Sequence, residues 1–225
     1  MDATYSAIIV GAGNSQRFQS KKNKLLFKLT NNLTIIETTL QTFLNDQKCT
    51  QIIVGVNDEI FTYLQPKYHD NYRVTFTIGG NERVDTIKNC LLNNKIINDI
   101  ILIHDGARCY LTNDFIDKML DDFVANDYQT LIPLLRINDA IKKINDKEIV
   151  ETVHRSEYGL VQTPQMFKTS VLLGVYQNYQ KNPHKLSPIY DDSQLVELYA
   201  PEIAIHYFPG SKDNIKVTYL EDIID

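Results

Sequence analysis

From Ser6 to Leu135, hydrophobic and polar positions alternate between two patterns. Short, nearly continuous apolar runs are followed by stretches in which apolar residues recur every three or four positions. The continuous runs are typical of buried strands, and the periodic stretches are typical of helices that bury one face. The predicted strands are Ser6–Val10, Gln51–Val56, Val74–Ile78, Asp99–Ile103 and Gln129–Leu135. The predicted helices are Leu33–Leu44, Asp58–Leu64, Arg83–Leu92 and Asn113–Val124.

Strands that alternate with helices in this way predict an α/β fold with a mostly parallel central sheet flanked by helices. Helices at Lys168–Tyr179 and Gln194–Tyr199 and strands at Ile203–Phe208 and Ile215–Thr218 are predicted nearer the C-terminus. The chain has 225 residues, of which 43% are hydrophobic, and it shows no repeat or low-complexity linker. We therefore expect a single domain over residues 1–225.

A hairpin interrupts the pattern between residues 137 and 160. Ala140–Ile144 and Glu148–Val153 alternate apolar and charged residues on either side of the polar turn Asn145–Lys147. This alternation predicts two antiparallel strands with one face that favours burial. Because a hairpin is marginally stable by itself, we expect this arm to pack either on a second copy of the chain, giving a homodimer, or on its own domain.

Composition argues against nucleic-acid binding, membrane association and a cysteine metal site. The net charge of −5 argues against general nucleic-acid binding, which usually appears as a basic domain. No apolar run is long enough to span a membrane, and no basic-then-apolar leader is present, so no membrane partner is expected. The three cysteines show no Cys-x-x-Cys pairing, which favours a reduced, cytoplasmic protein without a cysteine metal site.

The loop after the first strand predicts phosphate binding. It begins with Gly11, Ala12 and Gly13, and no acidic residue lies between Asp2 and Glu37, although cations are frequent there. A loop that lets backbone N–H groups approach closely, followed by uncompensated cations, suits a polyphosphate. The segment lacks the Gly-Lys-Ser/Thr ending of a Walker-type loop and the third glycine of a dinucleotide-binding loop. An ordinary strand-to-helix turn with a solvated basic face is the alternative.

Further loops are expected beside this one, because ligands bind beyond the carboxyl ends of strands in parallel α/β sheets. Each contributes glycine, charged or hydroxyl side chains to one edge of the sheet. The segments are Gly79–Thr86, His104–Arg108, Gln162–Gln165 and Asp213–Thr218. Within the second of these, His104 is expected to point into the core and to be structural, since neighbouring strand residues face opposite sides.

The motifs in these loops resemble a known family. In order, they read Gly-x-Gly-x-x-x-Arg…Lys, Gly-Gly-x-x-Arg-x-x-Thr, His-Asp-Gly-Ala-Arg, Gln-Thr-Pro-Gln-x-Phe, Asp-Asp-x-x-Leu-Val-Glu and Asn-Ile-Lys-Val-Thr. This order resembles the 2-C-methyl-D-erythritol 4-phosphate cytidylyltransferases and, slightly less closely, the ribitol-5-phosphate cytidylyltransferases. The resemblance covers Ala7 to Asp222 and implies a Rossmann-like nucleotidyltransferase fold. It also implies transfer of CMP from CTP to a sugar-alcohol phosphate, with release of pyrophosphate and with Mg²⁺ or another divalent cation as cofactor.

The resemblance implies a role for each matching residue. Arg17 and Lys24 would stabilise the α-phosphate, and Asp105 would lie where metal, ribose and acceptor meet. The residues expected around the nucleotide are Gly11, Ala12, Gly13, Asn14, Ser15, Gly80, Asn81, Arg83, Thr86 and Asp105, with a structural role as the alternative for Arg83. Those expected around the acceptor are Asp105, Gly106, Arg108, Arg155, Thr163, Tyr190 and Lys216. The positions of Arg155 and Thr163 would reach into the neighbouring subunit's site.

Three residues depart from the family pattern. Ser15 replaces a usual glycine, and Asn23 replaces a proline, which would leave Lys24 less rigidly placed. Tyr190 stands where a threonine commonly touches the acceptor phosphate. These departures leave open whether the acceptor is methylerythritol phosphate or ribitol phosphate. A nucleotide-binding homologue without catalysis is a further alternative, against which the presence of Arg17, Lys24, Asp105 and Lys216 argues.

Overall fold

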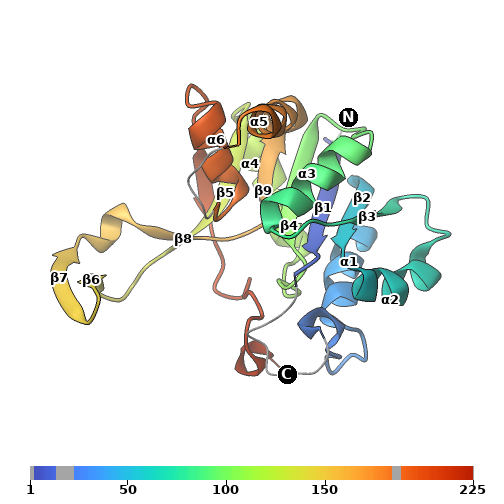
Figure 1. Ribbon diagram of the computed structural model, residues 1–225, viewed down its shortest axis with the longest axis horizontal. Helices are drawn as coiled ribbons and strands as arrows, with labels where there is room; N and C mark the ends of the chain where they lie inside the picture. Colours follow the sequence, from blue (N-terminus) through green and yellow to red (C-terminus); the bar gives the residue numbers. More distant parts are fainter. Residues whose placement is uncertain (1–2, 14–22, 184–188, 225) are drawn as a thin grey trace.

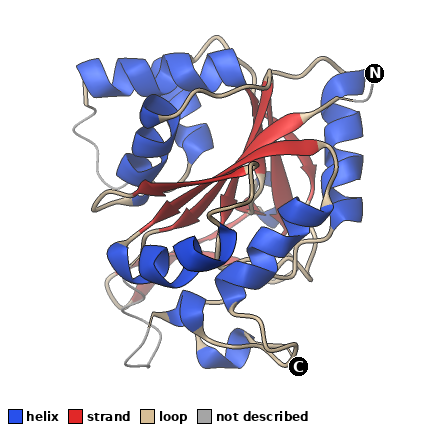
Figure 2. Cartoon of the chain, turned by 90° about the vertical axis from the view of Figure 1, so that its right-hand side faces the viewer, coloured by secondary structure: helices blue, strands red, loops and turns tan. Residues whose placement is uncertain are grey.

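A central sheet dominates the computed structural model of the chain, which describes residues 3–13, 23–183 and 189–224. Its strands are β1 (Tyr5–Gly11), β2 (Cys49–Val56), β3 (Val74–Ile78), β4 (Ile100–Asp105), β5 (Thr130–Arg136), β8 (Gly159–Val161), β9 (Gln165–Lys168) and β10 (His206–Pro209). The order is β10–β5–β9–β4–β1–β2–β3, with β8 paired to β5. Helices lie on both faces of the sheet (Figure 2).

The parallel pairings confirm the predicted mostly parallel α/β fold. Strand β1 runs parallel to both β2 and β4, β2 runs parallel to β3, and β10 runs parallel to β5. The helices are α1 (Ile35–Asn45), α2 (Asp58–Tyr68), α3 (Arg83–Asn93), α4 (Asn113–Ala125), α5 (Thr169–Lys181) and α6 (Asp192–Tyr199). Short 3-10 turns occur at η1 (Lys24–Leu26), η2 (Arg155–Glu157) and η3 (Leu220–Asp222).

The sheet separates two apolar clusters, because successive strand residues face opposite sides. Ile9 of β1 packs in the cluster that contains the buried residues of α1, α2 and α4. Its neighbour Ile8 packs in the cluster that contains the buried residues of α3, α5 and α6. Because β4 follows the same alternation, the side chains at its end also point to opposite faces, and this decides the surroundings of His104 and Asp105.

Polar side chains at the helix starts explain where several helices begin. Thr34 and Glu37 form a reciprocal capping box at α1, and Thr112 and Asp191 accept backbone N–H bonds at the starts of α4 and α6. Such caps satisfy donors that the first helical turn leaves unpaired. The cap at Asp191 places the next residue, Asp192, in the first turn of α6 and directs it into the protein.

The C-terminal half departs from the sequence prediction in four places. Strands β8 and β9 were not predicted; β8 pairs antiparallel with β5, and β9 lies antiparallel between β4 and β5. Ile215–Thr218 was predicted as a strand, but this segment has no strand pairing and is held by side-chain bonds. The last strand begins at His206 and not at Ile203. In each case strand identity depends on a pairing partner distant in the chain, which local apolarity does not reveal.

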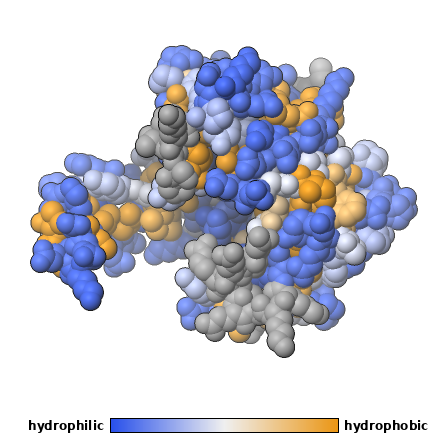
Figure 3. Space-filling view, viewed as in Figure 1, coloured by the Kyte–Doolittle hydropathy of each residue, from blue (hydrophilic) through white to orange (hydrophobic). Residues whose placement is uncertain are grey.

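The predicted arm forms a hairpin of its own. Strands β6 (Ile141–Asn145) and β7 (Glu148–Val153) pair antiparallel in a separate two-stranded sheet. The hairpin stands away from the body of the molecule (Figure 1). Apolar side chains lie uncovered on it at Ile144, Ile149 and Val150, which are 69%, 67% and 55% exposed, and apolar surface is visible on the arm in Figure 3. Among the described residues, no helix is long and apolar enough to cross a membrane.

Candidate functional site

The predicted loops meet at the carboxyl edge of the sheet. The N–H of Gly106, just after β4, donates to the carbonyl of Val10 in β1 at 2.9 Å. Gly79, just after β3, packs so closely against Ala12 that a Cβ on Gly79 would lie 2.4 Å from the Ala12 Cβ. The N–H of Gly80 donates to the Thr86 hydroxyl at 3.1 Å. The fold thus brings together the loop after β1 and the predicted loops Gly79–Thr86 and His104–Arg108.

Asp105, the last residue of β4, is the centre of a cluster of cations. Lys216 Nζ lies 2.7 Å from Oδ2, Arg83 Nε lies 3.2 Å from Oδ1, and Arg108 Nε lies 3.9 Å from Oδ2. Burial alone would raise the pKa of the Asp105 carboxyl, which is 6% exposed. The three cations outweigh burial and hold this pKa well below its usual range, so Asp105 is a carboxylate at neutral pH.

Two buried side chains, Thr163 and His104, hold the backbone of Asp105 in place. The Asp105 N–H donates to the Thr163 hydroxyl at 3.0 Å, and that hydroxyl lies 3.1 Å from His104 Nδ1. His104 Nε2 lies 3.2 Å from the Arg108 carbonyl, which can only accept, so Nε2 carries the proton and Nδ1 accepts from Thr163. Burial lowers the pKa of His104 to about 4, so the ring is neutral at pH 7.

These contacts agree with the structural role expected for His104 and show where Thr163 lies within its own subunit. The Thr163 side chain is 5% exposed and its hydroxyl is bonded to the Asp105 backbone and the His104 ring of its own subunit. Within its own subunit it therefore lies beside the end of β4, next to Asp105. Its contribution in this arrangement is to hold the end of β4 in place.

The segment 211–218 is held over the site by hydrogen bonds to other parts of the chain. Gln162 donates to the Ser211 carbonyl at 2.8 Å, and Arg108 donates to the Asn214 carbonyl at 2.7 Å. The Asn214 amide donates to the Thr163 carbonyl at 2.8 Å, and the Val217 N–H donates to the Ala107 carbonyl at 2.9 Å. These bonds carry Lys216 to Asp105 although the segment is not a strand.

Lys24 reaches the same place from the first loop. Its Nζ donates to the Val217 carbonyl at 2.7 Å, next to Lys216 in the chain. Asn23 fixes this turn, because its amide donates to the Gly13 carbonyl at 2.9 Å and its oxygen accepts from the Leu25 N–H at 3.1 Å. Asn23 is 7% exposed and caps η1, so these bonds hold the turn that carries Lys24. Asn14, Ser15 and Arg17 lie outside the described residues.

Arg83 forms ion pairs with two carboxylates. Besides Asp105, it contacts Asp192, whose Oδ2 lies 2.6 Å from the guanidinium. Burial lowers the pKa of Arg83, but the two carboxylates raise it more strongly.

Asn81, by contrast, is exposed in the turn before α3. Asp192 was not predicted as a site residue; the signal that pointed to it was the Asp-Asp pair ahead of an apolar helical pattern.

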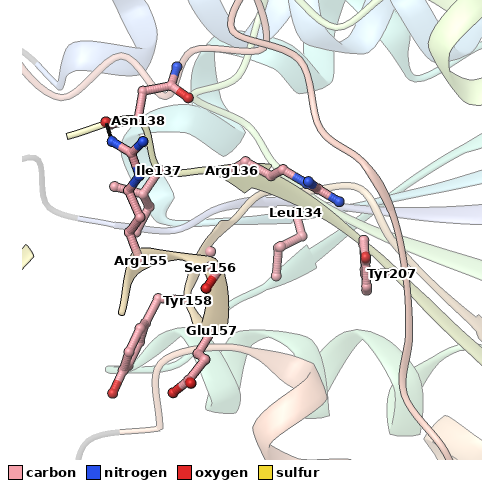
Figure 4. Close-up of a pocket in the computed structure, with 10 residues that line it drawn as sticks. Leu134, Arg136, Ile137, Asn138, Arg155, Ser156, Glu157, Tyr158 and Tyr207 are labelled. Carbon is pink, nitrogen blue, oxygen red and sulfur yellow. Dashed lines mark hydrogen bonds between the residues drawn. The ribbon is translucent and has the colours of Figure 1, made fainter. Parts of the chain in front are cut away.

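Arg155 is not brought to Asp105 within one chain. It lies at the base of the arm and donates to the Asn138 carbonyl. Together with Arg136, Tyr158 and Tyr207 it lines a cavity of about 490 Å³ that does not include Asp105 (Figure 4). Tyr190 is also peripheral: its side chain is 75% exposed, and its N–H donates to Gln194.

Taken together, the described part of the site offers cations, glycine-rich backbone and the carboxylate of Asp105. Among the described residues there is no cluster of three or more His, Cys, Asp or Glu side chains that would hold a metal ion by itself. The Thr163 hydroxyl donates to His104 Nδ1 at this edge, but both side chains are buried and the hydroxyl also accepts the Asp105 N–H. Lys24, Lys216 and Arg108 beside backbone N–H groups suit a multiply charged phosphate ligand, whose reaction is promoted by positioning and charge stabilisation.

Comparisons with known proteins agree with this chemistry. Residues 5–225 match the family model described as IspD: 2-C-methyl-D-erythritol 4-phosphate cytidylyltransferase. A Bacillus cereus protein of that name is 36% identical over 223 residues, which cover 98% of this chain and 95% of the relative. A protein of the same name from Clostridioides difficile is 32% identical over 222 residues, covering 97% and 90%.

Solved structures share the fold. The Francisella tularensis 2-C-methyl-D-erythritol 4-phosphate cytidylyltransferase superposes with a TM-score of 0.82 at 24% identity, covering 98% of this chain and 97% of that one. The Anaerococcus prevotii 4-diphosphocytidyl-2C-methyl-D-erythritol synthase superposes with a TM-score of 0.79 at 24% identity, covering 99% and 96%. At this level of identity the superpositions establish the architecture.

Proposed function

Because the chain belongs to the 2-C-methyl-D-erythritol 4-phosphate cytidylyltransferase family, we propose that it transfers CMP from CTP to 2-C-methyl-D-erythritol 4-phosphate. The observation that carries the proposal is that Lys24, from a distant segment, contacts Val217 next to Lys216, which in turn contacts Asp105. The enzyme would thereby serve isoprenoid precursor synthesis. Three buried, unpaired cysteines agree with the expected cytoplasmic location.

The reaction needs little covalent help from the protein. The acceptor is a phosphate monoester whose second pKa is about 6, so it is already a nucleophile near neutral pH. One of its oxygens attacks the α-phosphorus of CTP, the bond from that phosphorus to the α,β-bridging oxygen breaks, and pyrophosphate leaves with the electron pair. The barrier lies in bringing two anions together and in stabilising charge on the α-phosphate.

Different residues of the site would bind the triphosphate, the nucleoside and the acceptor phosphate. The Gly11–Gly13 backbone and Lys24 would bind the triphosphate, and Arg17, outside the described residues, would complete the cation pair. Gly80, Asn81 and Thr86 would surround the base and ribose. A Cβ on Gly80 would lie 2.2 Å from the Asp85 Cβ, so only glycine leaves the turn its present shape. Lys216 would leave Asp105 for the acceptor phosphate.

A divalent cation fits this arrangement when it arrives with the triphosphate. Mg²⁺ usually takes one or two carboxylates together with phosphate oxygens. Asp105 is the described carboxylate at the centre of the site, and it retains unused lone pairs beside its contacts to Lys216 and Arg83. When bound there, the ion would neutralise phosphate charge. The chain's own cations would position the two phosphates for in-line attack.

The first test is pyrophosphate release by the purified chain with CTP and Mg²⁺. We expect release with methylerythritol 4-phosphate and little with ribitol 5-phosphate at equal concentration. A reversed preference would assign the chain to CDP-ribitol synthesis and make exposed Tyr190 the first residue to examine. Failure to release pyrophosphate with either acceptor, by protein that is folded and binds CTP, would contradict catalysis and favour the non-catalytic homologue.

We propose further that the arm makes a homodimer and completes the neighbouring site. The uncovered apolar residues of β6 and β7 favour a partner surface, and Arg155 lies at the arm base, apart from Asp105 of its own chain. In this arrangement Arg155 would bind the acceptor phosphate of the second subunit. A monomer would then have an incomplete acceptor site.

Mixing two inactive variants tests the shared site. In a heterodimer of Arg155→Ala and Lys24→Ala chains, one site contains Lys24 and the partner's intact Arg155, while the other contains neither. Random pairing makes about half of the dimers mixed, so we expect about a quarter of wild-type activity after subunit exchange. Mixing Lys24→Ala with Asp105→Asn is the control, because both changes lie in the same half-site and no intact site forms. No recovery in the first mixture, with exchange demonstrated, would refute sharing.

Asn23→Ala is expected to weaken CTP use. The change removes the bond to Gly13 and the cap of η1, each of which stabilises the turn by about 1 kcal/mol. We expect KM for CTP to rise about three- to tenfold with only a small loss of thermal stability. Asn31→Ala is the matched control, because Asn31 accepts from the Leu33 N–H in an exposed turn. Equal KM values for the two variants would contradict a role of Asn23 in shaping the first loop.

A further inference from the structure

A chain of buried polar contacts runs from three helices to Asp105. The Tyr176 hydroxyl donates to Asp192 Oδ1 at 2.5 Å, and Arg83 Nη1 donates to Asp192 Oδ2 at 2.6 Å. Arg83 Nε then donates to Asp105 Oδ1 at 3.2 Å. Tyr176, Arg83 and Asp192 belong to α5, α3 and α6, which cover the same face of the sheet. Asp105 points to that face while His104 points to the other.

Asp192 determines how the Arg83 guanidinium lies. Both Asp192 and Tyr176 are fully buried, and Asp192 follows the capping residue Asp191, so neither carboxylate oxygen can turn towards solvent. Burial raises the pKa of Asp192, and Arg83 and Tyr176 counteract this increase. A guanidinium presents its N–H groups in a rigid fork. With Nη1 fixed on Asp192, Nε is aimed at Asp105 and contacts only one of its two oxygens.

As a consequence, the two oxygens of the Asp105 carboxylate have different partners. Arg83 contacts Oδ1, and Lys216 contacts Oδ2 at 2.7 Å. Lys216 is 42% exposed and is therefore the mobile partner, whereas the Arg83 side chain is 22% exposed and doubly held. If Asp192 did not hold it, the Arg83 charge would be free to follow the phosphates instead of Asp105. Asp105 would then lose its fixed orientation.

We propose that Asp192 is a positioning residue that acts through Arg83 to hold the Asp105 carboxylate in the orientation used for phosphate transfer. The inference rests on the proposed function, since it assigns Asp192 to that same site. It also makes the Arg83–Asp192 pair part of the acceptor half of the enzyme and not of the cytosine pocket. In this role Asp192 touches neither substrate.

Asp192→Asn is the first test, because it removes the charge and keeps the size. We expect kcat to fall about tenfold to a hundredfold while KM for CTP changes less than about threefold. Glu37→Gln is the matched control: Glu37 is a buried carboxylate 2.6 Å from Lys67, on the opposite face of the sheet and away from Asp105. It is expected to lose comparable thermal stability and to keep wild-type kcat. A folded Asp192→Asn variant with wild-type kcat would overturn the proposal.

A double variant tests whether Asp192 works through Arg83. If it does, adding Asp192→Asn to Arg83→Gln lowers kcat little beyond the effect of Arg83→Gln alone, since coupled residues are not additive. Independent, multiplying losses would overturn the route through Arg83. If Asp192→Asn fails to fold, Arg83→Lys replaces it: one ammonium retains the charge but does not span both carboxylates, so kcat is again expected to fall. Wild-type kcat in Arg83→Lys would contradict the proposal.

A readout independent of activity separates this inference from the proposed function. In a crystal structure of Asp192→Asn, we expect Arg83 to have left hydrogen-bonding distance of Asp105. An unchanged Arg83–Asp105 contact would overturn the inference even if the variant were inactive. If the wild-type protein released no pyrophosphate, the proposed function would fail, and this structural comparison would still decide whether Asp192 positions Arg83 on Asp105.

Discussion

Asp105→Asn is expected to lower kcat for pyrophosphate release by about a thousandfold, the largest loss of any single change in the described site. The carboxylate is the common partner of Lys216, Arg83 and Arg108. An amide removes the charge that orients these cations and the proposed contact to a divalent ion. The measurement is steady-state pyrophosphate release at saturating CTP and acceptor, with Asp114→Asn, an exposed partner of Lys118, as the unaffected control.

The same change is expected to destabilise the fold. Asp105 and Arg108 are almost fully buried, and removing one partner of a buried ion pair typically costs about 3–5 kcal/mol. Since Arg83 and Lys216 retain some solvent access, the lower end of that range is expected. Denaturant unfolding at neutral pH measures it. Wild-type stability together with wild-type kcat would show that the carboxylate neither organises the cations nor takes part in transfer.

The pH dependence of that stability difference has a definite sign. The folded-state pKa of Asp105 lies far below its unfolded value of about 3.9. Its contribution is therefore fully present above about pH 4 and is lost as pH falls from there towards the folded-state pKa. The gap in unfolding free energy between wild type and Asp105→Asn should stay constant from about pH 8 to 5 and shrink below about pH 4. A gap that shrank on the alkaline side would contradict the assigned ion pairs.

Lys216→Met is expected to produce the second-largest effect, lowering kcat/KM for the acceptor about a hundredfold or more. Lys216 is the exposed, movable partner of Asp105 and, in the proposed reaction, the cation that binds the acceptor phosphate. Stability should fall less than in Asp105→Asn, because Asp105 keeps Arg83 and Arg108 and because Lys216 is partly exposed. CTP binding, measured by calorimetry, should also be nearly unchanged.

Lys212→Met is the matched control for that change, since Lys212 is exposed in the same segment. It should leave kcat/KM for the acceptor near the wild-type value. If the loss in Lys216→Met appeared in CTP affinity and not in acceptor use, Lys216 would belong to the nucleotide half of the site. Lys216→Arg should recover only part of the activity, because the larger, planar group does not reproduce a compact ammonium.

Local sequence determined much of this protein. The strands and helices from Ser6 to Leu135 follow from apolar runs and helical periodicity, and the structure confirms them to within a few residues at each end. The arm follows from alternation around a polar turn. The glycine-rich loop, the His-Asp-Gly-Ala-Arg segment and the Asn-Ile-Lys-Val-Thr segment also identified the family that the comparisons establish. These features depend on neighbours in the chain, so the sequence displays them directly.

Tertiary structure alone decided the rest. Strand β9 exists because β4 and β5 supply partners on both of its edges, and Lys216 reaches Asp105 because Gln162, Arg108 and Lys24 hold an unpaired segment over the sheet. Asp192 meets Arg83 across 109 positions of sequence. Such contacts arise from the packing of three helices on one face of the sheet, and periodicity in one segment carries no information about the partner that packing places opposite it.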